Sequence, residues 1–175
     1  MNNLSSYDHP ISLRSGTDIF PVHETALEKL LNELLEHCPA AFILLADVSG
    51  QVIMVEGQRG GMDLVALASL VAGDLAASQE IARLSGEYQS YQLILREGQK
   101  YNTFISEAGK HLLLFVQVSC QVPLGWARLL IQETARQASE VMNTPVEIVD
   151  KLDLGLDKEG LSDLFGNALD AMWNG

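Results

Sequence analysis

The sequence predicts an α/β fold, a three-layer α/β/α sandwich in which helices cover both faces of one five-stranded antiparallel sheet. Five apolar runs of strand length occur, two before and three after a long helical segment, and within each group short glycine-containing turns join them. Three longer segments carry apolar residues at helical spacing, in the order helix, hairpin, helix, three-strand meander, helix. The 175 residues, 47% hydrophobic and 19% charged, suit one folded domain with short extensions.

The domain is expected over residues 23–143. Residues 1–22 before it mix Ser, Asn, Asp, Gly and Pro without a period, which predicts a flexible N-terminal arm. The first helix is predicted at residues 24–37, because leucines recur there at helical spacing with glutamates on the opposite side. Pro39 ends this helix.

A β-hairpin is predicted next, with strands at residues 41–46 and 51–55. The link between them begins with Asp47 and ends with Gly50, which is turn chemistry: the aspartate bonds back to the backbone and the glycine supplies positive φ. The glycine-rich residues 57–61 that follow lack the GxxxxGK[ST] pattern of a phosphate-binding loop. We therefore interpret them as a flexible connection.

The second helix is long, from an N-cap at Asp63 to about residue 84, with Gly86 as a C-cap. A meander of three strands follows at residues 89–96, 101–106 and 111–118, joined by short turn-type links. The third of these strands has five consecutive apolar residues, which is typical of a central strand covered on both faces. A third helix is predicted to open at Pro123 and Gly125 and to run to about residue 142.

Residues 144–175 form an acidic C-terminal extension with an amphipathic helix at about residues 158–173. Its apolar stripe is large enough to predict a docking element, either on the chain's own domain or on a partner. The candidate docking residues are Leu161, Leu164, Phe165, Leu169 and Met172.

The long helix has two apolar faces on a helical wheel. One arc can pack on the sheet and consists of Leu64, Ala68, Val71, Leu75 and Ala82. The opposite arc, where a surface helix normally carries charge, consists of small residues: Ala66, Ser69, Gly73, Ala76 and Ala77.

Small residues let two helix backbones approach closely. Gly73 costs about 1 kcal/mol against alanine in mid-helix, and close packing would offset that cost. We therefore predict that this helix crosses its symmetry mate in a homodimer. Contact with another segment of the same chain, or simple exposure of alanines, is the alternative.

Charge argues against broad binding to nucleic acid or anionic lipid, because 23 acidic and 11 basic residues give a formal net charge of -12. The N-terminus lacks the apolar core of a secretory signal and no uninterrupted apolar run is long enough to span a bilayer, so we expect a cytoplasmic protein without membrane insertion. Cys38 and Cys120 are expected to be reduced and buried.

Chemistry-bearing motifs are sparse. The four histidines share no metal-ligand spacing with each other or with either cysteine, and the sequence contains no CxxC motif and no GxSxG elbow. We therefore predict a non-enzymatic interaction module with no catalytic residues, no metal and no cofactor. An enzyme is kept as a remote alternative.

Four stretches together resemble the roadblock / dynein light chain family, in its bacterial type: residues 41–53, 64–84, 111–118 and 123–131. The resemblance covers about residues 24–142. It implies a fold like that of profilin and longin domains, and homodimers or heterodimers in which the long helix and the first meander strand lie beside their mates. Tyr91, Leu93 and Leu95, which share one face of that strand, thereby join the predicted dimer interface.

The resemblance also implies partners. Family members bind small Ras-like GTPases as activators, co-activators or scaffolds, or bind dynein chains, and bacterial members usually act on a GTPase without donating a catalytic residue. Our first hypothesis is a homodimeric regulator or scaffold of a small Ras-like GTPase that positions the GTPase switch segments. The second is a structural adaptor in a larger assembly with no effect on a nucleotide cycle.

Overall fold

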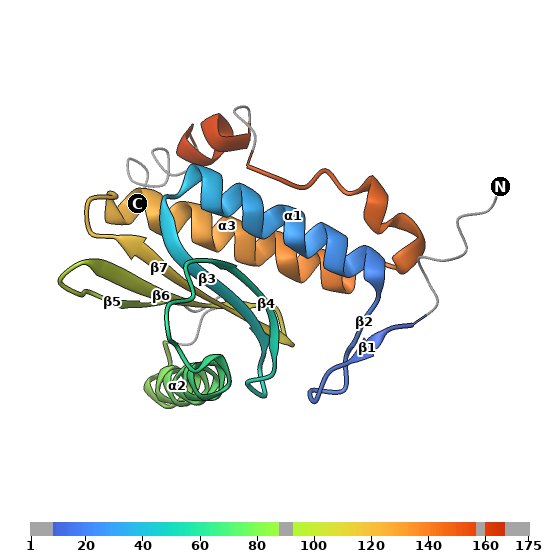
Figure 1. Ribbon diagram of the computed structural model, residues 1–175, viewed down its shortest axis with the longest axis horizontal. Coiled ribbons are helices and arrows are strands. Elements are labelled where there is room, and N and C mark those ends of the chain that lie inside the picture. The colour runs from blue at the N-terminus through green and yellow to red at the C-terminus, as the bar shows by residue number, and fades with distance from the viewer. Residues whose placement is uncertain (1–8, 88–92, 157–159, 167–175) are drawn as a thin grey trace.

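A computed structural model describes residues 9–87, 93–156 and 160–166 of the chain. Its main sheet has five antiparallel strands in the order β4-β3-β7-β6-β5. The strands are β3 (Ala40–Asp47), β4 (Val52–Gly57), β5 (Leu93–Arg96), β6 (Tyr101–Ala108) and β7 (Leu112–Ser119). Helices α1 (Pro21–His37) and α3 (Leu124–Asn143) cover one face, and α2 (Leu64–Ser85) covers the other (Figure 1). The predicted α/β/α sandwich is confirmed.

Two apolar clusters occupy the two interlayer spaces. The larger cluster lies between the sheet and the pair α1 and α3, and the smaller one lies beneath α2. The centre of β7 contributes to both, because alternate side chains of a strand point to opposite faces. Leu112–Val116 is buried throughout, as expected for a central strand covered on both sides.

The long helix begins and ends where its caps predict. The Asp63 carboxylate accepts a hydrogen bond from the Ala66 backbone N–H at 3.0 Å. Gly86 lies in the left-handed region with φ 77°, where a residue with a side chain would be strained. Local capping chemistry therefore sets both ends of α2.

The N-terminal region differs from the flexible arm expected over residues 1–22. From residue 9 onward it contains a small hairpin of β1 (Ile11–Ser12) and β2 (Asp18–Ile19), and α1 begins at Pro21 instead of residue 24. Leu13 and Ile19 are buried in the larger core cluster, and burial of these side chains holds the hairpin on the domain. Proline suits the first position of a helix, which explains the earlier start.

The C-terminal extension packs back on the domain as far as the structure describes it. After α3, the 3-10 helix η2 (Val146–Lys151) buries Val149 against the larger cluster. The chain then runs along the outer side of α1 and α3 (orange in Figure 1), and Leu154 and Leu156 join the same cluster. Residues 160–166 are helical, inside the predicted C-terminal helix.

Candidate protein interface

One face of α2 packs on the sheet and the other faces solvent. Ala68, Val71, Ala72 and Leu75 are buried beneath the helix. These include three of the five residues expected to pack on the sheet, and the other two, Leu64 and Ala82, are half-buried. The wheel therefore assigns the inner face correctly.

The outer face of α2 is apolar and exposed. All five small residues of the predicted dimer arc lie on it and are exposed: Ala66, Ser69, Gly73, Ala76 and Ala77. Large apolar side chains flank them, with exposed fractions of 68% for Val65, 72% for Leu70, 67% for Ile81 and 72% for Leu84. Sequence reasoning missed these four, although on the helical wheel they lie on or beside the small-residue arc.

Gly73 has no packing partner among the described residues. A Cβ built at this position meets no atom within 4 Å. Contact with another part of the described chain therefore does not account for a glycine in mid-helix, which costs about 1 kcal/mol against alanine.

Because its outer face is apolar as well as its inner face, α2 resembles a membrane-spanning helix in length and composition. Among the described helices, α2 is long and apolar enough to cross a membrane by length and composition, with a mean hydropathy of 1.4 over its most apolar window. A search of the sequence for uninterrupted apolar runs misses this similarity, because the charged residues Asp74 and Glu80 interrupt the apolar sequence of the helix. Two apolar faces produce it, one on the sheet and one in solvent.

β5 lies at an edge of the sheet, as expected for the first meander strand. Leu93 packs against the cluster on the α1 and α3 side, whereas Ile94 packs beneath α2. Leu95 is 40% exposed, and Tyr91 lies outside the described residues. Since β5 has β6 on one side only, a contribution of this edge to an interface would come mainly from backbone groups.

An ion pair connects β5 to α2. The Arg96 guanidinium donates a hydrogen bond to Asp74 Oδ1 at 2.8 Å, and its Nη1 lies 2.8 Å from Asp74 Oδ2 as an ion pair. The ion pair therefore links the strand edge, one predicted part of the interface, to the middle of the long helix, the other part.

The candidate docking residues of the C-terminal helix contact the chain's own domain where they are described. Leu161 packs against the larger core cluster. Phe165 stacks on Trp126 of α3 with ring centroids 4.9 Å apart, although 46% of its side chain remains exposed. Leu164 is half-buried, and Leu169 and Met172 lie outside the described residues.

Reactive groups are scattered over the described part of the chain. No three His, Cys, Asp or Glu side chains there come close enough together to hold a metal ion. Burial raises the pKa of the Cys38 thiol to about 11, which suppresses the reactive thiolate. Cys120 is exposed instead of buried as expected, because it lies just after β7 ends at Ser119, and its thiol donates to the Gly98 carbonyl oxygen at 3.3 Å.

The chain is similar to solved structures of MglB. An MglB with tetrameric arrangement shares 31% identity over 69% of this chain and 90% of that one, with a TM-score of 0.61. MglB of Myxococcus xanthus shares 30% identity over 67% of this chain and 94% of that one, with a TM-score of 0.62.

A Roadblock/LC7 domain from Streptomyces avermitilis shares the fold at 17% identity, with a TM-score of 0.58 over 66% of this chain and 96% of that one. No protein-family model and no curated protein matches the chain. The order of elements, the exposed long helix and the identity to MglB agree with the resemblance seen in the sequence. The chain belongs to the roadblock family.

Proposed function

We propose that this protein is a homodimeric, non-enzymatic regulator or scaffold of a small Ras-like GTPase in the cytoplasm. It acts by positioning the switch segments of the GTPase, and its two copies meet through the outer face of α2. Membership of the roadblock family supports the class of function. The exposed face of α2 supports the mode of assembly.

The main observation that supports a dimer is the composition of the outer face of α2. Val65, Leu70, Ile81 and Leu84 present large apolar surfaces to solvent on both sides of a row of small residues. Contiguous exposed apolar surface of this kind is typical of protein interaction sites. In a two-fold dimer each copy covers the same patch on the other, and the open position at Gly73 allows the two helices to approach closely.

A regulator of this kind works by differential binding. If the dimer holds the switch segments in one arrangement, it binds one nucleotide state of the GTPase more tightly and shifts the population toward it. The chain then needs no catalytic side chain of its own. A structural adaptor, the second hypothesis, binds both nucleotide states equally.

Retention on immobilised GTPase separates the two hypotheses. Small Ras-like GTPases from the same cell are loaded with a slowly hydrolysed GTP analogue or with GDP, and retention of the full chain is measured. We expect clear dependence on the nucleotide. Equal retention would favour the adaptor, and turnover by the purified chain alone would contradict a non-enzymatic role.

A further inference from the structure

The segment after η2, residues 152–156, is called the strap. It lies beyond residue 142, where the resemblance to the roadblock family ends. The strap has no regular secondary structure, yet it follows the outer side of α1 and α3 closely (Figure 1). Side chains of these two helices bind its backbone.

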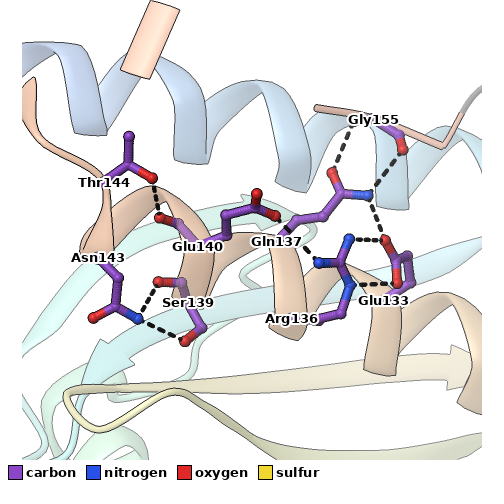
Figure 2. Close-up of polar contacts among 8 residues, drawn as sticks. All are labelled: Glu133, Arg136, Gln137, Ser139, Glu140, Asn143, Thr144 and Gly155. Atoms are coloured by element: carbon purple, nitrogen blue, oxygen red, sulfur yellow. Dashed lines mark hydrogen bonds and ion pairs between the residues drawn. The ribbon is translucent and has the colours of Figure 1, made fainter. Parts of the chain in front are cut away.

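Gln137 of α3 binds both backbone polar groups of Gly155. Its side-chain N–H donates to the Gly155 carbonyl oxygen at 3.0 Å, and its carbonyl oxygen accepts from the Gly155 N–H at 2.8 Å (Figure 2). This pair imitates the pairing of one residue in a β-ladder. Gln137 is only 4% exposed, so the two hydrogen bonds are shielded from water.

The residues on either side of Gly155 are bound by α1. The Lys29 ammonium donates to the Leu154 carbonyl oxygen at 2.7 Å, and the Glu33 carboxylate accepts from the Leu156 N–H at 2.5 Å. Both hydrogen bonds involve a charged group and are stronger than neutral ones. Three successive strap residues are thus bound through their backbone.

Gln137 is also held in position for this role. Its side-chain nitrogen donates to Glu133 at 2.8 Å, and Glu133 in turn accepts two hydrogen bonds from Arg136, at 2.7 and 2.9 Å (Figure 2). The amide therefore has a fixed orientation, with its oxygen toward the Gly155 N–H. This orientation favours one register of the strap.

Lys29 and Glu33 of α1 and Gln137 of α3 line the surface that binds the strap, which is called the groove. The side-chain pattern of the strap matches this groove as well. Leu154 and Leu156 are 8% and 2% exposed and belong to the larger core cluster, which they join from the outer side of α1 and α3. Gly155 has φ +144°, and a Cβ there would clash with the carboxylate oxygens of Glu33, which the Leu156 N–H holds in place. The groove therefore buries the two leucines and disfavours a side chain between them, chiefly because a φ of +144° is strained for residues other than glycine.

We propose that the groove between α1 and α3 is a peptide-recognition site for an extended leucine-glycine-leucine segment, and that the chain's own strap occupies it. The bound strap fixes where the following helix starts, and this brings Phe165 onto Trp126. The bound strap thereby holds the C-terminal helix on its own domain, and this role of the strap is called the latch. This inference depends only on the contacts between the strap and helices α1 and α3, and it does not depend on the proposed role with a GTPase.

Hydrogen exchange of the full chain tests the latch. We expect Gln137→Ala and Gly155→Ala to speed exchange at the backbone amides of positions 155 and 156 by about tenfold or more, with the sheet and α2 unchanged. Gln132→Ala, on the same helix, and Gly61→Ala, where a Cβ meets nothing within 4 Å, are the matched controls. Strap exchange equal to that of the controls would overturn the proposal.

A peptide of residues 150–166 tests recognition. Labelled peptide is added to the full chain carrying Gly155→Ala, whose own strap is weakened, and to a control chain that carries Gly61→Ala and keeps its natural strap. We expect the natural peptide to bind the first chain at least about tenfold more tightly than a peptide carrying the same glycine-to-alanine change. Equal binding of both peptides, or no binding, would overturn recognition and leave the strap as ordinary core cover.

Discussion

Asp47 is a fully buried carboxylate that joins two parts of the chain. It accepts hydrogen bonds from the Ser49 N–H and hydroxyl and from the Gln51 N–H, which close the turn between β3 and β4. It also accepts from the Ser15 N–H at 3.0 Å, which anchors the N-terminal hairpin. Burial alone would raise its pKa, but these hydrogen bonds outweigh burial and lower it.

We expect Asp47→Asn to destabilise the chain by about 2 kcal/mol at pH 7, because an amide cannot accept all of these hydrogen bonds. Urea unfolding measures the loss, and Asp150→Asn at an exposed position is the control. The folded carboxyl has the lower pKa, so its contribution is complete above about pH 4 and disappears as the pH falls through the folded value. A loss that is the same at pH 7 and in acid would contradict this assignment.

His23 is a buried histidine near the start of α1, with 4% of its surface exposed. Burial lowers its pKa, and a backbone hydrogen bond at Thr144 offsets only part of this effect. The unfolded chain therefore takes up a proton near pH 6.5 that the folded chain resists. Stability should decline as the pH falls below about 6.5, until the folded ring is protonated too.

The test compares pH profiles of unfolding free energy between pH 7.5 and 5. His23→Gln should flatten the profile relative to the natural chain, whatever its effect on stability at pH 7.5. His9→Gln, at an exposed position, should leave the slope unchanged. If both variants keep the natural slope, the acid sensitivity does not come from His23.

At the scale of elements, α2 contains the main part of the predicted dimer interface. Gly73→Leu should leave the isolated chain folded, because the position is open in this structure. In the dimer the same change overpacks the helix crossing, at a cost of about 1–3 kcal/mol that a symmetric interface incurs twice. We expect sedimentation to show monomers or aggregates with circular dichroism largely kept, whereas Gly61→Leu stays dimeric. A dimer of unchanged affinity would exclude this face.

The edge of β5 is predicted to pair with its own copy. Amides of Leu93–Leu95 that point away from β6 would then be hydrogen-bonded and should exchange slowly at concentrations where the dimer is intact. Amides on the outer side of β4, the opposite edge of the sheet, provide the comparison. Fast exchange along both edges would refute strand pairing.

At the scale of the whole molecule, the C-terminal extension is expected to add to the core. Deleting residues 150–175 removes the buried Leu154 and Leu156, each worth about 1.5–3 kcal/mol. We expect the melting temperature to fall by about 10 °C, since 1 kcal/mol corresponds to about 2–4 °C at this size. Phe165→Ala, which removes the stacking on Trp126, should cost at least about 0.5–1.5 kcal/mol.

GTPase retention by the same deletion separates core cover from a partner-binding arm. If the extension only covers the core, the deletion should lower the melting temperature, and the chains that remain folded should still be retained on the GTPase. If the extension is a partner-binding arm, the deletion should leave the melting temperature almost unchanged and weaken retention on the GTPase. The second result would contradict the role of Leu154 and Leu156 in the core.

The sequence by itself determined the order of the helices and strands and the two faces of α2. Asp63 and Gly86 end that helix through hydrogen bonds to residues nearby in the chain, and periodicity separates its inner and outer faces. Only the tertiary structure decided how the two extensions fold. The hairpin depends on Asp47, 32 residues from Ser15, and the strap on Glu33, 123 residues from Leu156. Hydrogen bonds between side chains and distant backbone leave no periodic pattern, so such segments have the composition of flexible arms until the fold brings their partners together.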